Sequence, residues 1–412
     1  MSFFTVICFY SGVAYSQITL EECQEKAREN FPLIKQYELI EQSKEYTLSN
    51  ANKAFLPQLD VTIIGGVIDG LPSFSPPGTE SSSTNLNMIS IVQLNQAIWD
   101  GGITKASKGI IEASSEIEKA DLEVSLYSLE DRVNNMYFGI LLIEEQVQQL
   151  AILKSTLKRN LKRVEIAVEN GTAFKSDIDE ILVEIINAEQ RIEELKFNRS
   201  AYVNVLSAMI GEPIEEGHKF IRPQLDDSYK SMDINRPELS LFENQENLIE
   251  AKNKIDKAML YPKIGLMGFG TFIRPGVDFG ASQLENILVA GLSVNWSLGG
   301  VYKNSNNKKL TEVNLQKVNV QRETFLFNTN LDLTQTEMEL EKYKTLIEQD
   351  NELLTLKSRI KDAYDVKYEN GVSTMSELLD RVNDESIAKQ NLVVHEIQYL
   401  MKAYQYKNKS GN

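Results

Sequence analysis

The chain has 412 residues and a formal net charge of −16, which argues against nucleic-acid binding because phosphates favour basic surfaces. Hydrophobic residues make up 42% and charged residues 25% of the sequence, a composition typical of folded proteins. The two histidines, His218 and His395, cannot build a conventional zinc site by themselves. We expect neither a metal nor a cofactor.

The chain begins with an apolar segment at residues 1–16. It ends in Ala14-Tyr15-Ser16, and small residues at the first and third of these positions predict signal-peptide cleavage after Ser16. The segment is shorter than the ~20 residues that a helix needs to cross a bilayer. No lysine or arginine precedes Lys26. Either the natural start lies upstream, which we favour, or the segment is not a signal. We expect export from the cytoplasm.

The rest of the chain predicts a tandem duplication. The tract VENGTAFKSDIDEIL at 168–182 returns as YENGVSTMSELLDRV at 368–382, an offset of 200 residues. Three more landmarks repeat in the same order at offsets of 197 to 205 residues: Asn30 with Asn235, Pro57 with Pro262, and Trp99 with Trp296. The predicted divisions are a signal peptide at 1–16, a first repeat at 17–210, a linker at 211–239, a second repeat at 240–406 and a flexible tail at 407–412.

Each repeat is predicted to contain the same elements in the same order. An opening helix, which in the first repeat starts with the capping-box pair Thr19 and Glu22, runs to a proline, Pro57 or Pro262, that a helix interior does not tolerate. Two strands follow, then a long helix that breaks at an Asn-Gly pair, then a closing helix. The strands are predicted near residues 57–68, 86–99, 262–273 and 287–298, and the tips of the helical hairpins near 170–177 and 370–377.

Heptads mark the long helices. Apolar residues alternate spacings of three and four along residues 143–168 and 178–206, and this 3.5-residue period packs helices side by side as coiled coils. The two segments joined at Asn170-Gly171 are therefore predicted to form an antiparallel hairpin. At 1.5 Å per residue, a helix over 103–168 would be ~100 Å long, which no compact domain needs.

Apolar and polar residues alternate along the predicted strands, as they do in membrane β-strands. Apolar residues take every second position in 59–63 and 290–298, with small or polar residues between them, as a transmembrane β-strand requires. Trp99 and Trp296 lie near strand ends and suit the aromatic girdle of a membrane interface. For any single strand a soluble sheet with one wet face remains the alternative. Four strands cannot close a barrel, and lipid does not tolerate an open edge, so several copies must share one barrel.

A duplicated unit of helix, strand pair and coiled-coil hairpin resembles the TolC-like outer-membrane efflux protein family. The resemblance covers nearly the whole chain, from Thr19 to Ser410. The sequence ITLEECQEKARENFP is similar to the family's opening helix, and Pro57 and Pro262 stand at its helix-to-strand junctions. The tracts 171–177 and 371–377 are similar to its hairpin tips.

The resemblance implies a mainly α fold with membrane β-strands. Long antiparallel coiled-coil hairpins would form an α-barrel, and four transmembrane strands per chain would join a shared 12-stranded trimeric β-barrel. The implied function is a passive exit duct of a tripartite efflux or type I secretion system, spanning the outer membrane and periplasm of a Gram-negative bacterium. The implied partners are two further copies of the chain, a periplasmic adaptor protein, an inner-membrane pump and outer-membrane lipid.

The resemblance also implies residues that constrict the pore. Family members narrow the tunnel with acidic residues beyond the second tip, and the matching positions are Glu377 and Asp380. Three residues apart, they share a helix face and would form rings of negative charge in a trimer, a filter that favours cations. The plain structural alternative is that both are acids at a helix start, where the dipole favours each by ~0.3–1 kcal/mol.

The hairpin tips carry the remaining expected sites. Family members hold the closed state through contacts between hairpins, and Asp177 and Tyr368 fall where two such partners stand. The basic residue that often joins them is replaced by Ser373, so we expect weaker or different contacts. Asn170-Gly171 and Asn370-Gly371 allow positive φ at tight turns and would shape the tips on which the adaptor docks.

An enzyme is not expected, because the sequence contains no phosphate-binding loop, dinucleotide fingerprint or nucleophile motif. The main alternative function is a periplasmic adaptor. Such a protein has one hairpin flanked by compact β-domains, whereas here a strand pair precedes each of two hairpins. A soluble coiled-coil scaffold is the third possibility, and it has no reason to carry amphipathic strands.

Overall fold

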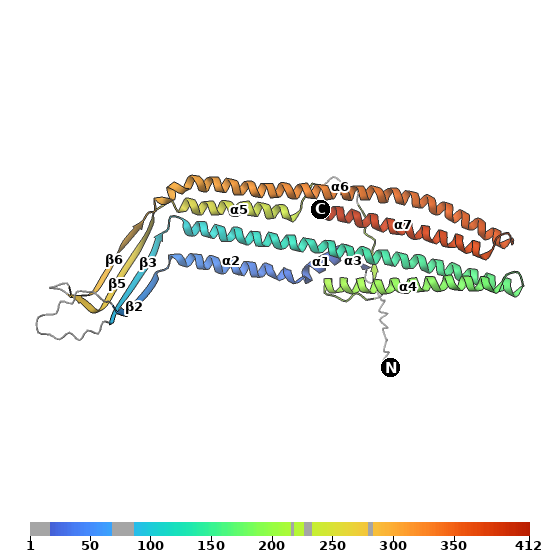
Figure 1. Cartoon of the computed structure of the whole chain (residues 1–412), viewed down its shortest axis with the longest axis horizontal. Coiled ribbons are helices and arrows are strands. Elements are labelled where there is room, and N and C mark those ends of the chain that lie inside the picture. Colours follow the sequence, from blue (N-terminus) through green and yellow to red (C-terminus); the bar gives the residue numbers. More distant parts are fainter. Residues whose placement is uncertain (1–16, 68–85, 216–217, 226–232, 279–282) are drawn as a thin grey trace, which may run out of the picture. The chain divides into compact units, whose positions relative to one another are not determined.

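A computed structural model describes residues 17–67, 86–215, 218–225, 233–278 and 283–412. Over these residues the chain is mainly helical, with seven α-helices, a four-stranded antiparallel sheet and a two-stranded parallel pair (Figure 1). A mainly helical chain with an antiparallel sheet is what the sequence predicts. The predicted signal peptide at 1–16 and the connection at 69–85 between the first two predicted strands lie outside the described residues.

The helices are α1 (Leu20–Asn30), α2 (Gln36–Asn52), α3 (Ile103–Glu169), α4 (Lys175–Ile210), α5 (Pro237–Ala258), α6 (Gly299–Glu369) and α7 (Met375–Ser410). Two short 3₁₀ helices are η1 (Pro32–Lys35) and η2 (Lys53–Phe55). The strands are β1 (Gln17–Ile18), β2 (Gln58–Val67), β3 (Leu86–Trp99), β4 (Lys219–Phe220), β5 (Lys263–Asp278) and β6 (Gln283–Asn295).

The opening helix differs from its prediction. Its start is as expected, because the Thr19 side chain accepts the Glu22 amide and the Glu22 carboxylate accepts the Thr19 amide, a complete capping box. However, α1 ends at Asn30 and does not continue to Pro57. Phe31 is extended because the ring of Pro32 disfavours the helical conformation in the residue before it. The chain passes through η1 before α2 begins.

Two compact units divide the chain, and each draws on both predicted repeats. The first unit contains Met1–Lys35, Leu122–Pro237 and Thr324–Asn412, and the second contains Gln36–Asp121 and Glu238–Glu323. The compact units are therefore not the two sequence repeats. The predicted linker at 211–239 also contributes regular structure, since β4 pairs with β1 and α5 begins at Pro237, where proline suits the first helical turn.

The four-stranded sheet belongs to the second unit. Its strand order is β2-β3-β5-β6, and every neighbouring pair is antiparallel. The central β3–β5 pairing joins residues far apart in sequence, for example Ile91 with Thr271. Strands β2 and β6 form the two edges. Pro57 and Pro262 directly precede β2 and β5, so each closes the helical segment before a strand, as predicted.

The register gives the sheet two different faces. One face is apolar at each strand; we call it the apolar face, and its most exposed members are Leu59, Val61, Ile63, Leu94, Leu266, Leu288, Leu292 and Val294. The opposite face is polar near the helical end of the sheet; we call it the polar face, and its members there include Asp60, Thr62, Gln93, Asn95, Ser293 and Asn295.

The second strand pair is longer than predicted on its loop side. The sequence Arg274-Pro275-Gly276 favours a turn, and the strands predicted near 262–273 and 287–298 leave 274–286 as the connection between them. Instead β5 continues to Asp278 and β6 begins at Gln283, with the ladder shifting register between Phe272 and Val277. A proline without an amide hydrogen is tolerated at such an irregularity. The strand resumes beyond it because pairing with β6 satisfies the remaining backbone groups.

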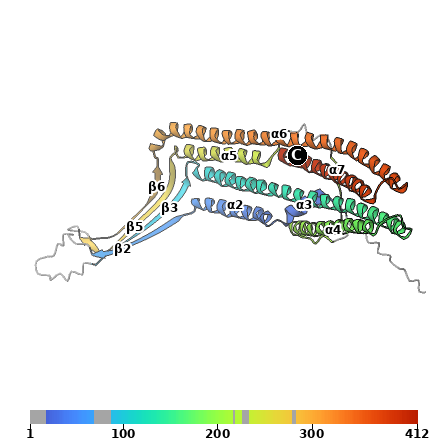
Figure 2. The same ribbon diagram turned by 45° about the vertical axis from the view of Figure 1, so that its right-hand side comes forward.

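The first unit is built on two helical hairpins, and α3 lies beside α4 and α6 beside α7 in both views (Figures 1 and 2). One hydrophobic core joins α1, α3, α4, α7 and β4. Its centre is Tyr137, whose side chain is fully buried. The Tyr137 hydroxyl lies 2.8 Å from the Ile18 carbonyl and 2.7 Å from the Ile221 carbonyl, and it accepts the Ile221 amide at 3.1 Å. The side chain therefore fastens the β1–β4 pair onto α3.

The predicted flexible tail at 407–412 is wrong. Helix α7 continues to Ser410, which is 1% exposed, and Gly411 ends it in a left-handed conformation with φ 85°. The Asn235 amide donates to the Ser410 carbonyl at 2.7 Å. The polar composition suggested a loose end, but these side chains and amides find partners in the fold. Among the described residues, no helix is long and apolar enough to cross a bilayer.

Candidate functional site

The two hairpin tips have the same backbone geometry. In the first tip the Gly171 amide donates to Val168 O at 3.0 Å and the Thr172 amide to Ala167 O at 2.8 Å. The same two hydrogen bonds recur in the second tip, from Gly371 and Val372. Both glycines have positive φ, 73° and 71°. This is the Schellman arrangement, and it explains why an Asn-Gly pair ends each long helix.

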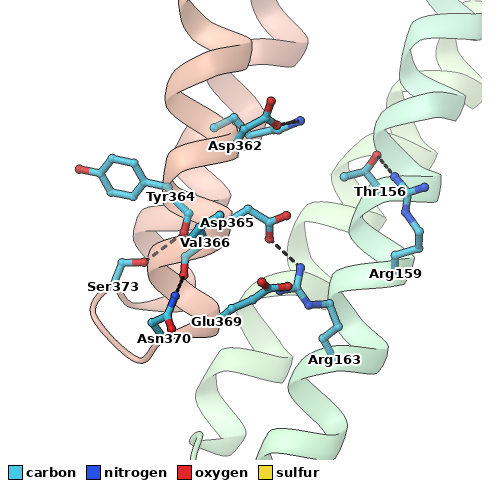
Figure 3. Close-up of polar contacts among 11 residues, drawn as sticks. Thr156, Arg159, Arg163, Asp362, Tyr364, Asp365, Val366, Glu369, Asn370 and Ser373 are labelled. Atoms are coloured by element: carbon cyan, nitrogen blue, oxygen red, sulfur yellow. Dashed lines mark hydrogen bonds and ion pairs between the residues drawn. The ribbon is translucent and has the colours of Figure 1, made fainter.

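The asparagines of the tips close the same turns. Asn170 donates from its side chain to the Ile166 carbonyl at 2.9 Å. Figure 3 shows the equivalent contact of the second tip, in which Asn370 donates to the Val366 carbonyl at 2.7 Å. In each tip the side chain adds a second hydrogen bond to a carbonyl that already accepts the backbone amide of the same asparagine. The four predicted tip residues therefore form two matched, rigid turns.

A core between the hairpins holds the tips together. Its buried members come from α3, α4 and α7, and partly buried tyrosines of α6 pack against it; they are Leu157, Val164, Ile181, Ile185, Met375, Leu378, Leu379, Val382, Tyr364 and Tyr368. All four helices contribute, so the tip of the first unit is a small four-helix bundle. Burial of such side chains stabilises a contact by about 25 cal/mol per Å² of apolar surface.

Arg163 of α3 makes a polar link between the hairpins (Figure 3). Its guanidinium lies 2.7 Å from an Asp365 carboxylate oxygen and 3.0 Å from a Glu369 oxygen, both on α6. The same guanidinium lies 5.7 Å from the centre of the Tyr368 ring, within the range of a cation–π interaction. We call these four residues the tip cluster.

Asp177 and Tyr368, predicted as contact partners, interact electrostatically. Burial raises the pKa of the Tyr368 hydroxyl, the Asp177 carboxylate raises it further, and Arg163 opposes both. Asp177 also accepts the Phe174 amide at 3.0 Å, so it caps the start of α4. The hydroxyl of Ser373, the residue that stands in place of a basic one, lies 3.4 Å from the Tyr364 carbonyl.

Sequence reasoning missed Arg163. It falls within the heptad tract of α3, where charged residues are frequent, and its partners lie 202 and 206 positions away. No local pattern indicates such a pairing. Arg163 thus brings a cation from the first hairpin to two carboxylates of the second.

Glu377 and Asp380 have different surroundings. Glu377 completes a capping box, because its carboxylate accepts the Thr374 amide at 3.0 Å and its own amide donates to the Thr374 hydroxyl at 3.2 Å. Asp380 is exposed and lines a groove of about 400 Å³ between α4 and α7. Three further carboxylates line this groove, those of Asp179, Glu180 and Glu184. Glu377 therefore has the role of an acid at a helix start, whereas Asp380 belongs to an acidic surface.

The two tryptophans lie at the helical end of the sheet. Trp99 ends β3, is 42% exposed and packs edge-on against Tyr261 at 6.4 Å between ring centres. Trp296 follows β6, is 59% exposed and donates its indole hydrogen to the Leu260 carbonyl at 3.0 Å. Each therefore has an apolar ring in solvent and a fixed anchor in the chain.

The apolar face is left uncovered by the second unit. Leu288 is 80% exposed, Leu292 72% and Val294 70%. Soluble monomers rarely expose so contiguous an apolar surface, so an apolar medium or a partner is needed to cover it. No group of three or more metal-ligating side chains is found within the described residues.

No protein-family model matches the chain, and no curated protein matches it either. Solved structures do resemble it. The outer membrane protein VceC of Vibrio cholerae is 13% identical, with a TM-score of 0.66 over 94% of this chain and 96% of that one. The CmeC outer membrane channel of Campylobacter jejuni is also 13% identical, with a TM-score of 0.62 over 98% and 91%.

The MtrE outer membrane channel of Neisseria gonorrhoeae, solved in its open state, gives a similar result. It is 16% identical, with a TM-score of 0.65 over 95% of this chain and 88% of that one. At these identities the similarity establishes the fold. The chain has the fold of TolC-like bacterial outer-membrane channels, as the sequence resemblance predicts.

Proposed function

We propose, on the basis of this shared fold, that the chain is one protomer of an outer-membrane exit channel for efflux or export. The observation that carries the proposal is the apolar face, which is exposed in the folded chain and alternates with a polar face. Such alternation suits a strand with lipid on one side and water on the other. The channel would lie in the outer membrane and extend into the periplasm.

The open sheet edges support a trimer. Strands β2 and β6 each have one neighbour, and an unpaired edge is not tolerated in a lipid environment. Pairing β6 of one copy with β2 of the next removes every edge once the ring closes. Three copies of four strands would give twelve, and eight is the usual minimum for a membrane barrel.

The hairpin tips would form the periplasmic end of a passive conduit. Two rigid turns exposed at the tip of the bundle offer a docking surface for a periplasmic adaptor, and an inner-membrane pump would supply the energy. Arg163 would hold the second hairpin against the first in the resting state. Outward movement of α6 and α7 would then open the conduit as a shift between two states.

The acidic groove would influence which ions pass. Asp380 and its neighbours on α4 place several carboxylates along one side of the tip bundle. Repeated in a trimer around the axis, they would form a ring that attracts cations. Glu377 would add to the ring from its capping position.

The first experiment is the mass of the complex extracted from membranes, corrected for bound detergent. About three protomer masses, each 46.7 kDa for this chain, recovered only with detergent, is the result we expect. A monomer released without detergent would overturn the proposal and favour an adaptor or a coiled-coil scaffold.

A second experiment tests the acidic ring in planar bilayers. Asp380→Asn should weaken block by a trivalent cation such as hexamminecobalt, and adding Glu377→Gln should weaken it further. Glu193→Gln, at an exposed acid farther along α4, is the matched control. Equal block in wild type, variants and control would exclude a selectivity role for Asp380 and Glu377.

A further inference from the structure

A cavity with several charged and amide side chains in its walls lies in the second unit at the junction of the sheet and the helices. Its volume is about 380 Å³, within the range of small-molecule sites, and its walls come from the end of α5, the start of β5, the end of β6 and the first turns of α6. Met259 and Tyr261 contribute apolar surface to the lining, and its polar side chains are Asp256, Lys263, Asn295, Ser297, Lys303, Asn304 and Asn307.

Two ammonium groups dominate the charge of the cavity. Lys263 starts β5 and Lys303 lies in the first turns of α6. Within the described part of the chain, neither lysine forms an ion pair. One carboxylate, that of Asp256, opposes them.

The cavity opens on the polar face of the sheet. Lys263 pairs with Asn295 in the β5–β6 register, so their side chains point to the same side. The next residues along, Ile264 and Val294, belong to the apolar face. If lipid covers the apolar face, the cavity faces the interior of the conduit. The inference therefore rests on the proposed function for its placement, although binding itself does not require a channel.

The backbone also suits an oxyanion. Gly299 and Gly300, the first residues of α6, line the cavity, and the amides at the start of a helix have no intrahelical partner. A Cβ atom at Gly300 would lie 3.2 Å from the Leu260 side chain, so glycine allows the close approach of α6 to this wall. The backbone amides of Gly299 and Gly300 add donors to the site, but its main groups are the two lysines and the asparagine side chains.

We propose that this cavity is a binding site for an oxyanion, a phosphate or carboxylate group of a small cargo molecule. Lys263 and Lys303 provide charge, and Asn295 and Asn307 provide hydrogen-bond donors. In a trimer three such sites would surround the conduit where the sheet meets the helices. Lysine rings of this kind favour anions in pores. The conduit would then present carboxylates at the hairpin tips and ammonium groups at the sheet junction.

The first repeat does not carry the same site. At the offsets of the repeat, Gln58 stands where Lys263 stands and Ile98 where Asn295 stands. In the β2–β3 register Gln58 pairs with Asn95, so the corresponding corner has side-chain amides but lacks the lysine charge. The site belongs to the second repeat alone, which makes the first repeat an internal reference.

Titration calorimetry on the detergent-solubilised complex tests the site, with inorganic phosphate and citrate as probes at low ionic strength. The combined change Lys263→Gln with Lys303→Gln should raise the dissociation constant at least about tenfold, since hydrogen bonds to charged groups are the strong ones. The control is Lys308→Gln with Lys309→Gln, two exposed lysines of the same helix outside the cavity. It changes net charge equally and should leave binding within about twofold.

The substitution Asp256→Asn tests whether the cavity binds an anion or a cation. Removing the carboxylate should tighten phosphate binding, because it removes a repulsion from the cavity. Weaker binding would instead indicate a cation site and overturn the proposal, as would equal affinity in wild type and the lysine variant.

Planar bilayers separate this proposal from the proposed function. If the complex conducts but phosphate neither binds nor changes the conductance, the oxyanion site is wrong and the channel stands. If phosphate binds with the expected dependence on Lys263 and Lys303 but no channel forms, the site stands and the proposed function fails.

Discussion

The guanidinium of Arg163 and the carboxylate of Asp365 lie 2.7 Å apart and connect the first helical hairpin to the second. The two residues come from different repeats and meet only in the folded chain. Both side chains are about one-third or more exposed, so water screens the pair and its share of stability is small, ~0.2–1 kcal/mol. Its importance is positional, because it joins the two elements that must separate if the tips open.

Arg163→Gln should therefore increase the single-channel conductance clearly, while the stability of the complex falls only slightly. Without the cation, Asp365 and Glu369 lose their shared partner, and the second hairpin keeps only its other contacts with the first, chiefly the hydrophobic core. Single-channel recording in planar bilayers checks this. Lys196→Gln is the control, because Lys196 pairs with Glu193 of its own helix. Wild-type conductance in Arg163→Gln would show that the tip cluster does not restrain opening.

The start of α7 should depend on Thr374. Thr374→Ala removes the hydroxyl that accepts the Glu377 amide, and loss of such a cap typically costs ~1 kcal/mol. Amide hydrogen exchange in the first turn of α7 should accelerate about fivefold. Ser376→Ala, an exposed position of the same turn, should leave exchange unchanged. If the two variants exchange alike, the capping box contributes nothing to the order of the second tip.

Tyr137→Phe should loosen the β1–β4 pair. The phenylalanine ring fills nearly the same volume, but the part-buried carbonyls of Ile18 and Ile221 lose the hydroxyl as a partner, at a cost of roughly 0.5–1.5 kcal/mol. The denaturation midpoint of the extracted complex should fall accordingly. Amide hydrogen exchange should accelerate most near Ile221. Tyr202→Phe, at a partly exposed ring on α4, provides the comparison. A stability equal to wild type would contradict the role given to the Tyr137 hydroxyl.

The lowered pKa of Glu385 predicts that the folded chain loses stability in acid. The residue is 9% exposed; burial tends to raise its pKa, but hydrogen bonds from Ser358 and Lys389 and the charge of Lys361 lower it overall. A carboxyl whose folded-state pKa is lowered stabilises above its unfolded value, ~4.3, and that contribution disappears as the pH falls through the folded-state pKa. Denaturation at pH 7 and at pH 3 should show Glu385→Gln less stable at pH 7, with a smaller loss on acidification.

Glu348→Gln, at an exposed acid of α6, should retain the wild-type pH dependence. An unchanged acid limb in Glu385→Gln would mean that other carboxyls carry the effect. Glu130 and Asp131 act in the opposite direction, since burial raises their pKa values and their protonation favours the folded state.

Gly411→Ala should be more damaging than Gly171→Ala. Both glycines have positive φ, which costs an L-residue ~1–2 kcal/mol. A Cβ at Gly411 would also lie 2.4 Å from the backbone of Asn235, whereas the space around Gly171 is open. Thermal unfolding should therefore separate the two variants. Equal losses would show that Gly411 does not need its close contact with Asn235.

The sequence predicted the fold class and the positions of the strands because both depend on short-range periodicity. The alternation along β6 and the heptads along α4 read directly as element types. The repeat of Asn-Gly located both hairpin tips for the same reason. The structure gives each tip the same turn, with φ 73° at Gly171 and 71° at Gly371.

What the sequence did not predict depends on contacts over long separations. The link from Arg163 to Asp365 spans 202 positions, and no local pattern encodes it. The order of the C-terminal residues depends on Asn235 of the predicted linker. Its amide donates to the Ser410 carbonyl, and its backbone packs closely against Gly411. The continuation of β5 past Pro275 likewise depends on its partner strand. The roles of Asp380 in selectivity and of the tips in docking stay predictions.

The pairing of β3 with β5 determines when the protein can fold as its chain is made. Ile91 must wait for Thr271, 180 residues later, before the middle of the sheet can form. Both compact units also need segments from each half of the chain, so a ribosome that has completed the first repeat has produced neither. Such long separations slow folding. Until β5 has been made, strand β3 has β2 as its one available neighbour in the sheet and is exposed to aggregation, a window in which a holding chaperone would matter most.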